Sequence, residues 1–355
     1  MTLERLEVTN FRCVARAKLE LDPRLTVIAG PNASGKTSLL EAVFFLSSGR
    51  SFRTSRVAPL IRTGQQEVSV VGRVASASRQ VVLGVRGTRS GLETKVAGLP
   101  VKGFAEHVRL LPVQAIDPEI HKLLEEGPSR RRRFLDWGVF HVERRYVAAW
   151  RRYQRALKQR NAGLKQRLRS SAIDLWDREL IQAADPLVDY RQRYLDVLAP
   201  KAASLVAALL RLDLELVHQR GWPQEKVFSD ALRDARPRDL QMGVTTVGPH
   251  RADLIVRLRG QLARDRVSRG QQKLLAAALV LAQIEHRAEL GGQMATLLLD
   301  DPAAELDAAN LAGFLERVAG LPAQLIVTAL DSATVQPLLG GRMFHVEQGD
   351  VRQML

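Results

Sequence analysis

The chain has 355 residues, 46% of them hydrophobic, and its 53 Lys or Arg against 38 Asp or Glu give a formal net charge of +15. It has no apolar run long enough to span a bilayer, no signal-peptide layout at its start, and one cysteine, Cys13, which excludes an internal disulfide. We therefore expect a cytoplasmic protein with no membrane partner. The excess of basic residues favours nucleic acid as a partner, against the alternative of a merely soluble or ribosome-bound basic protein.

Residues 1–118 read mostly as short strands. Alternating apolar residues predict three strands before residue 30, and glycine-punctuated runs predict three more between residues 68 and 96. Between these groups, residues 38–46 read as a helix that Gly49 ends. The simplest arrangement is an antiparallel sheet beside a second sheet that contains residues 25–29.

Residues 119–243 differ from residues 1–118, because little of this stretch is predicted to form strands. Apolar residues spaced by three, four or seven predict two long helices, over 146–168 and 180–209, which form a short antiparallel arm. Pro186 and Pro200 are expected to kink or divide the second helix. We interpret 119–243 as a helical lobe inserted into a domain made of residues 1–118 and 244–355.

The insertion also carries most of the charge. Residues 129–169 include 14 Lys or Arg and 2 acids, a net charge of +12. Such a run is usually a solvated helix face, but the acids that normally alternate with it are missing here. Bound phosphates would compensate the repulsion, so we expect nucleic-acid contacts in this lobe. The candidate residues are Arg130, Arg131, Arg151, Arg152 and Arg155.

Residues 244–355 again alternate between strand and helix. Strands are predicted at 254–258, 296–299, 325–328 and 343–346, the last of the chain, and helices at 271–287 and 311–319.

A phosphate-binding loop of the form G-x-x-x-x-G-K-T lies between the strand at 25–29 and the helix that follows it. Backbone N–H groups and a helix N-terminus meet there, which suits a polyphosphate. Lys36 would lie against the β- and γ-phosphates, and Thr37 would hold Mg²⁺. The expected nucleotide contacts are Gly30, Pro31, Asn32, Ala33, Ser34, Gly35, Lys36, Thr37 and Ser38.

A second part of the site follows the apolar run Leu297-Leu298-Leu299. Downstream of a P-loop, a buried strand that ends in two carboxylates is typical of a Walker B motif. Asp300 is then expected to reach the Mg²⁺ ion, and Asp301 to orient or activate the attacking water.

Ser268-Arg269-Gly270-Gln271 opens a predicted helix and resembles the signature motif of ABC ATPases, and residues 304–307 resemble their D-loop. The resemblance implies an α/β ABC-type ATPase head, with a P-loop mixed sheet and an antiparallel β subdomain, plus a mostly helical second lobe. It also implies that Ser268, Gly270 and Gln271 act in trans, completing the ATP site of a second copy in a head-to-head homodimer. Gln114 is either the Q-loop residue or a buried amide.

Two departures from the ABC pattern imply slow hydrolysis, which suits a switch better than a motor. Asp301 replaces the usual Glu and is one methylene shorter, and Ala329 stands where a switch histidine is usual.

Further motifs resemble the RecF family of bacterial recombination mediators, over essentially the whole chain. They are Phe11-Arg12, Ser51-Phe52-Arg53, Leu111 to Glu119, Arg131 to Gly138, and Thr246-Val247-Gly248-Pro249-His250-Arg251-Ala252-Asp253. The resemblance implies an ATPase related to the heads of chromosome-maintenance proteins, which binds double-stranded DNA at single-strand gaps. RecR, RecO and RecA are the implied partners, in replication-fork recovery and the SOS response. His250 and Arg251 carry no assigned role, since a lone histidine is more often structural.

Two other functions compete with this one. The nucleotide-binding subunit of a membrane transporter would share the signature and Walker B motifs, but the basic insertion does not fit it. A nucleic-acid scaffold would keep ATP as an unhydrolysed structural ligand.

Overall fold

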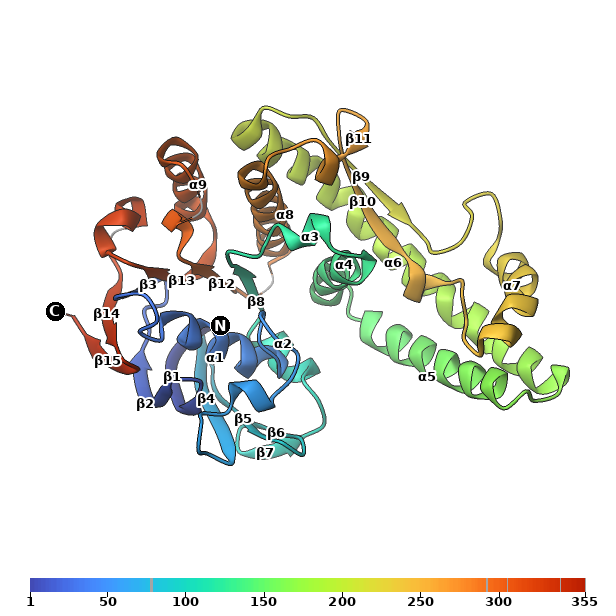
Figure 1. The fold of residues 1–355 in the computed structure, drawn as a ribbon, viewed down its shortest axis with the longest axis horizontal. Helices are drawn as coiled ribbons and strands as arrows, with labels where there is room; N and C mark the ends of the chain where they lie inside the picture. Colours follow the sequence, from blue (N-terminus) through green and yellow to red (C-terminus); the bar gives the residue numbers. More distant parts are fainter. Residues whose placement is uncertain (77–78, 292, 305, 339, 355) are drawn as a thin grey trace. The chain divides into compact units, whose positions relative to one another are not determined.

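The computed structural model describes residues 1–76, 79–291, 293–304, 306–338 and 340–354 (Figure 1). It divides into two compact units. The head unit comprises Met1–Ile120 and Arg287–Leu355, and the inserted unit comprises His121–His286. No helix within these described ranges combines the length and apolar character that crossing a membrane requires.

The inserted unit extends further along the chain than the 119–243 expected from the sequence. Its continuation is held by pairing across the predicted boundary, because β9 (Leu214–Gln219) pairs antiparallel with β10 (Asp253–Leu258). In addition, the Gln283 amide donates a hydrogen bond of 2.9 Å to the Phe134 carbonyl oxygen. Residues 244–286 therefore pack with the insertion.

The head unit contains a six-stranded sheet in the order β15-β14-β3-β13-β12-β8, in which every pairing except β14–β15 is parallel. Its central strands are buried along almost their whole length, as expected of a parallel sheet covered on both faces. The strands are β3 (Leu25–Ala29), β8 (Val113–Ile116), β12 (Ala295–Asp300), β13 (Ala323–Ala329), β14 (Arg342–Glu347) and β15 (Asp350–Gln353).

A second sheet of the head unit is antiparallel throughout, in the order β2-β1-β4-β5-β6-β7. The predicted antiparallel subdomain is confirmed, and it takes up the first two strands of the chain. Its strands are β1 (Thr2–Phe11), β2 (Val14–Glu20), β4 (Glu67–Ser76), β5 (Arg79–Thr88), β6 (Leu92–Val96) and β7 (Leu99–Val101).

Helix α1 (Lys36–Ser48) contacts strands of both sheets and joins them into one core. Leu39, Leu40, Phe45 and Leu46 are at most 1% exposed. The close packing requires a glycine opposite the helix, since a Cβ on Gly72 would lie 2.3 Å from the Leu46 side chain. Helices α2 (Ala105–Leu110) and α9 (Ala308–Gly320) complete this unit. Because α1 is fixed on two sides, the loop that precedes it is held in place.

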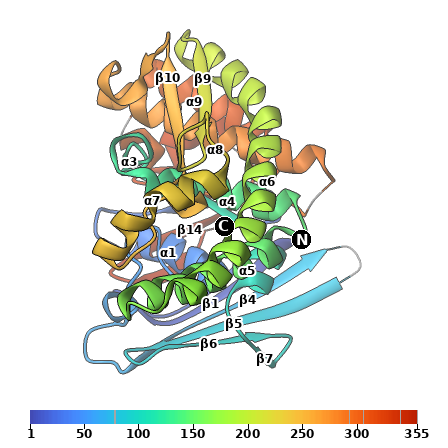
Figure 2. The ribbon, with the colours of Figure 1, turned by 90° about the vertical axis from the view of Figure 1, so that its right-hand side faces the viewer.

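The inserted unit is mostly helical (Figures 1 and 2). Its small sheet has the order β11-β10-β9, with β11 at Gln261–Leu262. Its helices are α3 (Lys122–Glu125), α4 (Pro128–Val142), α5 (Tyr146–Lys165), α6 (Ser170–Leu210), α7 (Phe228–Met242) and most of α8 (Arg269–Glu289).

Helix α6 runs for 41 residues with Pro186 and Pro200 inside it, so of the two expected effects, a kink or a division, the division does not occur. Its apolar stripe packs against α5, α4 and β9 on either side of the prolines, and Leu187 and Leu198 are at most 1% exposed. This packing outweighs the loss of two backbone hydrogen bonds.

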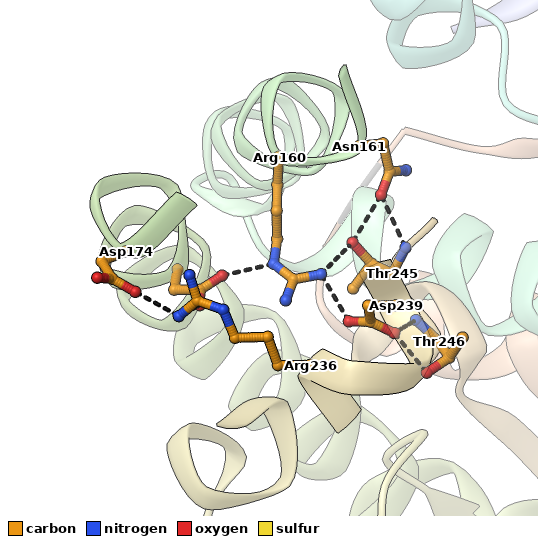
Figure 3. A network of polar contacts seen from close by, with 8 residues as sticks. Arg160, Asn161, Asp174, Arg236, Asp239, Thr245 and Thr246 are labelled. Atoms are coloured by element: carbon orange, nitrogen blue, oxygen red, sulfur yellow. Dashed lines mark hydrogen bonds and ion pairs between the residues drawn. The ribbon is translucent and has the colours of Figure 1, made fainter. Parts of the chain in front are cut away.

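The arm of α5 and α6 is fixed by buried polar contacts (Figure 3). Arg160 on α5 is fully buried and donates to Asp177 on α6 at 2.5 Å and to Asp239 on α7 at 2.7 Å. It also donates to the Thr245 hydroxyl at 2.8 Å, while Asp239 accepts from the Thr246 amide at 2.9 Å. One guanidinium therefore ties three segments of the inserted unit together.

Candidate nucleotide site

The loop Gly30–Gly35 leaves the end of β3 and enters α1, as the sequence predicts. Gly30 has φ 154°, and a Cβ there would lie 2.2 Å from the Val346 carbonyl oxygen. Gly35 has φ 113° and no side chain caps the first N–H groups of α1. These glycines let the backbone turn tightly and leave the helix N-terminus open to an anion.

Lys36 lies along the inside of this loop. Its ammonium donates to the carbonyl oxygens of Gly30 at 2.7 Å and Pro31 at 2.8 Å. Burial lowers the pKa of Lys36, and the carboxylates of Asp301 and Asp300 oppose that shift. A cation held beside two acids and a cluster of backbone N–H groups is placed to contact a polyphosphate.

Asp300, at the end of β12, lies next to the first turn of α1. The Thr37 hydroxyl lies 2.8 Å from its Oδ1 and 3.1 Å from its Oδ2, and the Thr328 hydroxyl donates to Oδ1 at 2.8 Å. Desolvation raises the pKa of the Asp300 carboxyl, and the Thr328 and Thr37 hydroxyls oppose that shift. Two residues 263 positions apart thus bring their side-chain oxygen atoms within hydrogen-bonding distance.

Asp301 follows in an unusual backbone conformation, with φ 47°. Its amide donates to the Thr328 hydroxyl at 2.9 Å, so the same threonine braces both acids. Asp301 lines a cavity of about 330 Å³ together with the P-loop. The other residues around that cavity are Cys13, Asn32, Ala33, Ser34, Gly35, Lys36, Thr37, Ser38, Arg53, Pro118 and Asp300.

These residues fit MgATP. The Ser34 hydroxyl is buried and has no hydrogen-bond partner among the described residues, so the loop holds a donor that a phosphate oxygen would satisfy. Within the described ranges, no group of three or more His, Cys, Asp or Glu gathers as a metal site. A Mg²⁺ ion would instead be held by the Thr37 and Asp300 oxygens together with phosphate and water.

Arg53 and Cys13 line this site, although neither was predicted to do so from the sequence. Arg53 lies beside Glu41, a buried acid of α1, with 4.0 Å between Nη1 and Oε2. Glu41 also accepts from Arg12 at 2.7 Å and from the Ser51 hydroxyl at 2.5 Å. Two sequence motifs, Phe11-Arg12 and Ser51-Phe52-Arg53, could have indicated these contacts, because Arg12, Ser51 and Arg53 all lie next to Glu41.

Gln114 lies within β8 and pairs in register with Leu297 of β12. It is a strand residue rather than a loop residue, and it is not among the residues around the cavity. The Q-loop role therefore stays a prediction.

The signature residues lie in the inserted unit, at the start of α8. The Ser268 hydroxyl accepts from the Gln271 amide at 3.3 Å, and the Gln271 side chain accepts from the Ser268 amide at 3.0 Å. This reciprocal pair is a capping box, which fixes the helix start. Ser268, Gly270 and Gln271 are all exposed, so they remain accessible to another molecule. Of the D-loop, Glu305 lies outside the described residues.

The five candidate DNA contacts do not share one environment. Arg131 is buried, and its guanidinium donates to both carboxylate oxygens of Asp253 at 2.8 and 2.9 Å. It faces the interior, so its assignment to a DNA surface is corrected. Arg130 pairs with Glu126 and Arg152 with Glu179, whereas Arg151 and Arg155 are exposed with no ion pair to a described acid.

His250 has a structural environment. Burial lowers its pKa to about 4, so the ring is neutral at neutral pH. Its Nε2 lies 3.0 Å from the Thr245 carbonyl oxygen, which can only accept. Nδ1 must therefore accept the hydrogen bond of 2.6 Å that joins it to the Tyr153 hydroxyl. Arg251 beside it is exposed.

The sheet pair, the P-loop and the acids after β12 define an ATPase head of the ABC and chromosome-maintenance class. Solved structures agree on this fold. An Smc head bound to the C-terminal winged-helix domain of ScpA matches with a TM-score of 0.60 at 18% identity, covering 100% of this chain and 97% of that one.

Closer relatives identify the family. The RecF/RecN/SMC N terminal domain family matches residues 2–350. The DNA replication and repair protein RecF of Shewanella pealeana is 39% identical, covering 99% of each chain, and that of Stutzerimonas stutzeri is 40% identical, covering 100% of this chain and 98% of the relative. The structure of the recombination mediator protein RecF-ATP in the RecFOR pathway matches with a TM-score of 0.89 at 27% identity, covering 100% and 98%. The chain belongs to the RecF family of DNA replication and repair proteins.

Proposed function

We propose that this protein is an ATP-dependent DNA-binding switch of recombinational repair, in which ATP and Mg²⁺ drive head-to-head dimerisation on double-stranded DNA. The observation that carries the proposal is the contact between Thr37 and Asp300, which brings a P-loop hydroxyl and a Walker B carboxylate into one oxygen cluster. The relative described as RecF-ATP supports ATP as the nucleotide.

Each residue then has a defined task. Lys36 and the open N-terminus of α1 bind the phosphates, while Thr37 and Asp300 hold the metal. Bound Mg²⁺ would supply charge neutralisation of the transferred phosphoryl group. Asp301 orients the attacking water, and its short side chain makes hydrolysis slow. Ser268, Gly270 and Gln271 contact the ATP held by a second copy, so ATP favours the dimer and hydrolysis releases it.

The partners of the proposed switch come from the family. Gapped duplex DNA is the expected substrate, with RecR and RecO as protein partners and RecA as the protein loaded onto the gap, in the cytoplasm. Of the predicted DNA contacts, Arg130, Arg151, Arg152 and Arg155 remain candidates, and of these Arg151 and Arg155 on α5 are exposed with no ion pair to a described acid.

Phosphate release with and without double-stranded DNA tests the catalytic part. We expect slow release that DNA accelerates, and a loss of about 100-fold in Asp301→Asn with ATP binding retained. Release that DNA leaves unchanged would refute DNA stimulation. No release under any condition would favour the scaffold alternative, in which ATP is only structural.

A further inference from the structure

A groove between α5 and α6 differs from the rest of the basic arm. Its volume is about 500 Å³, and its walls come from both helices of the hairpin. The residues that line it are Arg152, Arg155, Ala156, Leu175, Trp176, Arg178, Glu179 and Gln182. Every residue that lines the groove belongs to the inserted unit, whereas the P-loop belongs to the head unit.

The floor of the groove is apolar and accessible. Leu175, in the second turn of α6, is 56% exposed. Trp176 beside it is half-buried, and Ala156 is buried on the facing helix. Apolar surface of this kind gains free energy when a partner covers it.

The rim of the groove is basic. Arg152 is held by Glu179 at 2.6 Å and by the Gln182 side chain at 3.0 Å. Arg155 and Arg178 are exposed, and neither forms an ion pair with an acid in the described ranges. Three arginines against one glutamate leave the rim with unbalanced positive charge.

The groove is preformed, because ion pairs fix the spacing of the two helices. Arg152–Glu179 spans it directly, and the part-buried Arg160–Asp177 contact joins the same helices about two turns further along α5 (Figure 3). A partner that enters does not need to reorganise the arm, which lowers the entropic cost of binding.

We propose that this groove is a docking site for an acidic peptide segment that carries leucine or aromatic anchors. The anchors cover Leu175 and Trp176, and the acidic residues on either side pair with Arg155 and Arg178. Nucleic acid fits less well, since the most exposed apolar side chain of the groove, Leu175, has no ring on which a base can stack, and the ring of Trp176 is half-buried. The volume also exceeds that of one side chain and lies within the usual range of about 300–1,000 Å³ for ligand sites.

Fluorescence anisotropy of a labelled peptide, Gly-Glu-Glu-Leu-Phe-Glu-Glu-Gly, directly measures the binding of such a segment to the full chain. We expect saturable binding that weakens at high salt and is lost when Leu-Phe is replaced by Ser-Ser. Leu175→Glu and Arg178→Glu should each weaken binding about tenfold. Leu175 is largely exposed, so its substitution should leave the fold intact, which far-ultraviolet circular dichroism checks.

Arg155 lines the groove and is also a candidate DNA contact, so the matched control that separates the two surfaces uses Arg151. Arg151→Glu makes the same charge change on α5 outside the groove, so it should weaken duplex DNA binding and leave peptide binding unchanged. Arg178→Glu should do the reverse. The proposal is overturned by peptide binding that ignores both groove variants, by absence of saturable binding, or by groove variants that weaken only single-stranded oligonucleotide binding.

Discussion

The Asp300 carboxylate is proposed to bind Mg²⁺ as an anion, but its buried position disfavours the negative charge. Burial raises its pKa above the ordinary value of 3.8, so the folded state disfavours the ionised form that would bind Mg²⁺. When folding raises the pKa of a group, its contribution to stability is fully present below the pKa that the group has in the unfolded state. That contribution is lost as the pH rises through the pKa that the group has in the folded state. At neutral pH the ionised Asp300 therefore destabilises the fold.

Asp300→Asn should accordingly increase the free energy of unfolding of the nucleotide-free protein at pH 7 by about 1 kcal/mol. The amide still accepts from a threonine hydroxyl, and no charge is buried. Urea unfolding from pH 7 down to pH 3.5 should show the difference shrink as Asp300 protonates in the parent protein. The same variant should lose phosphate release. A stability loss at pH 7 would contradict the role given to burial.

Individual site residues were predictable from sequence to different degrees. Lys36 and Thr37 are fixed by the loop spacing, and Asp300 by the end of an apolar strand, because the sheet brings such strand ends together. Arg131 was misassigned because a run of arginines reports charge and not burial. Its partner Asp253 lies 122 positions away, and only the tertiary fold brings the two together.

At the level of elements, the Arg160 contacts hold the arm in register. Arg160→Met should destabilise the protein by about 3–5 kcal/mol, because Asp239 is fully buried and would lose its charged partner. The matched control is Arg193→Met, which removes an exposed pair with Asp189 and should cost about 0–1 kcal/mol. Comparable shifts in the urea midpoint of the two variants would show that the buried network does not stabilise the arm.

The exposed face of α5 has a separate test. Arg151→Glu with Arg155→Glu should flatten the dependence of log K on log salt for duplex DNA by about 2, one phosphate contact for each arginine. Arg89→Glu, in the exposed turn after β5, supplies the same kind of charge change in the head unit. An unaltered slope in the double variant would place the DNA contacts elsewhere.

Most elements follow from periodicity, and two of the three exceptions share a cause. Helix α6 continues through its prolines, β9 lies in a stretch that was predicted to be helical, and β15 follows the strand expected to be last. Strand β15 pairs with the neighbouring β14 across the two-residue turn Gln348-Gly349. For α6 and β9, in contrast, packing or pairing with a distant segment decides the outcome, as when β9 pairs with β10. Local propensity carries no information about such partners.

At the scale of the whole molecule, the nucleotide loop and the signature residues belong to different units of one chain. In the dimer that we propose, two copies complete each other, with Ser268 of one chain facing the phosphates held by Lys36 of the other. ATP is then a ligand of the dimer interface, and its binding energy stabilises association.

Sedimentation velocity with and without ATP and Mg²⁺ tests this central claim most directly. We expect a species of 39.4 kDa alone and one of twice that mass with ATP, stabilised further by duplex DNA. Lys36→Ala should stay monomeric because it does not bind ATP, and Ser268→Arg should bind ATP yet stay monomeric. A parent protein that remains monomeric with ATP bound, or a Ser268→Arg variant that dimerises normally, would contradict the account.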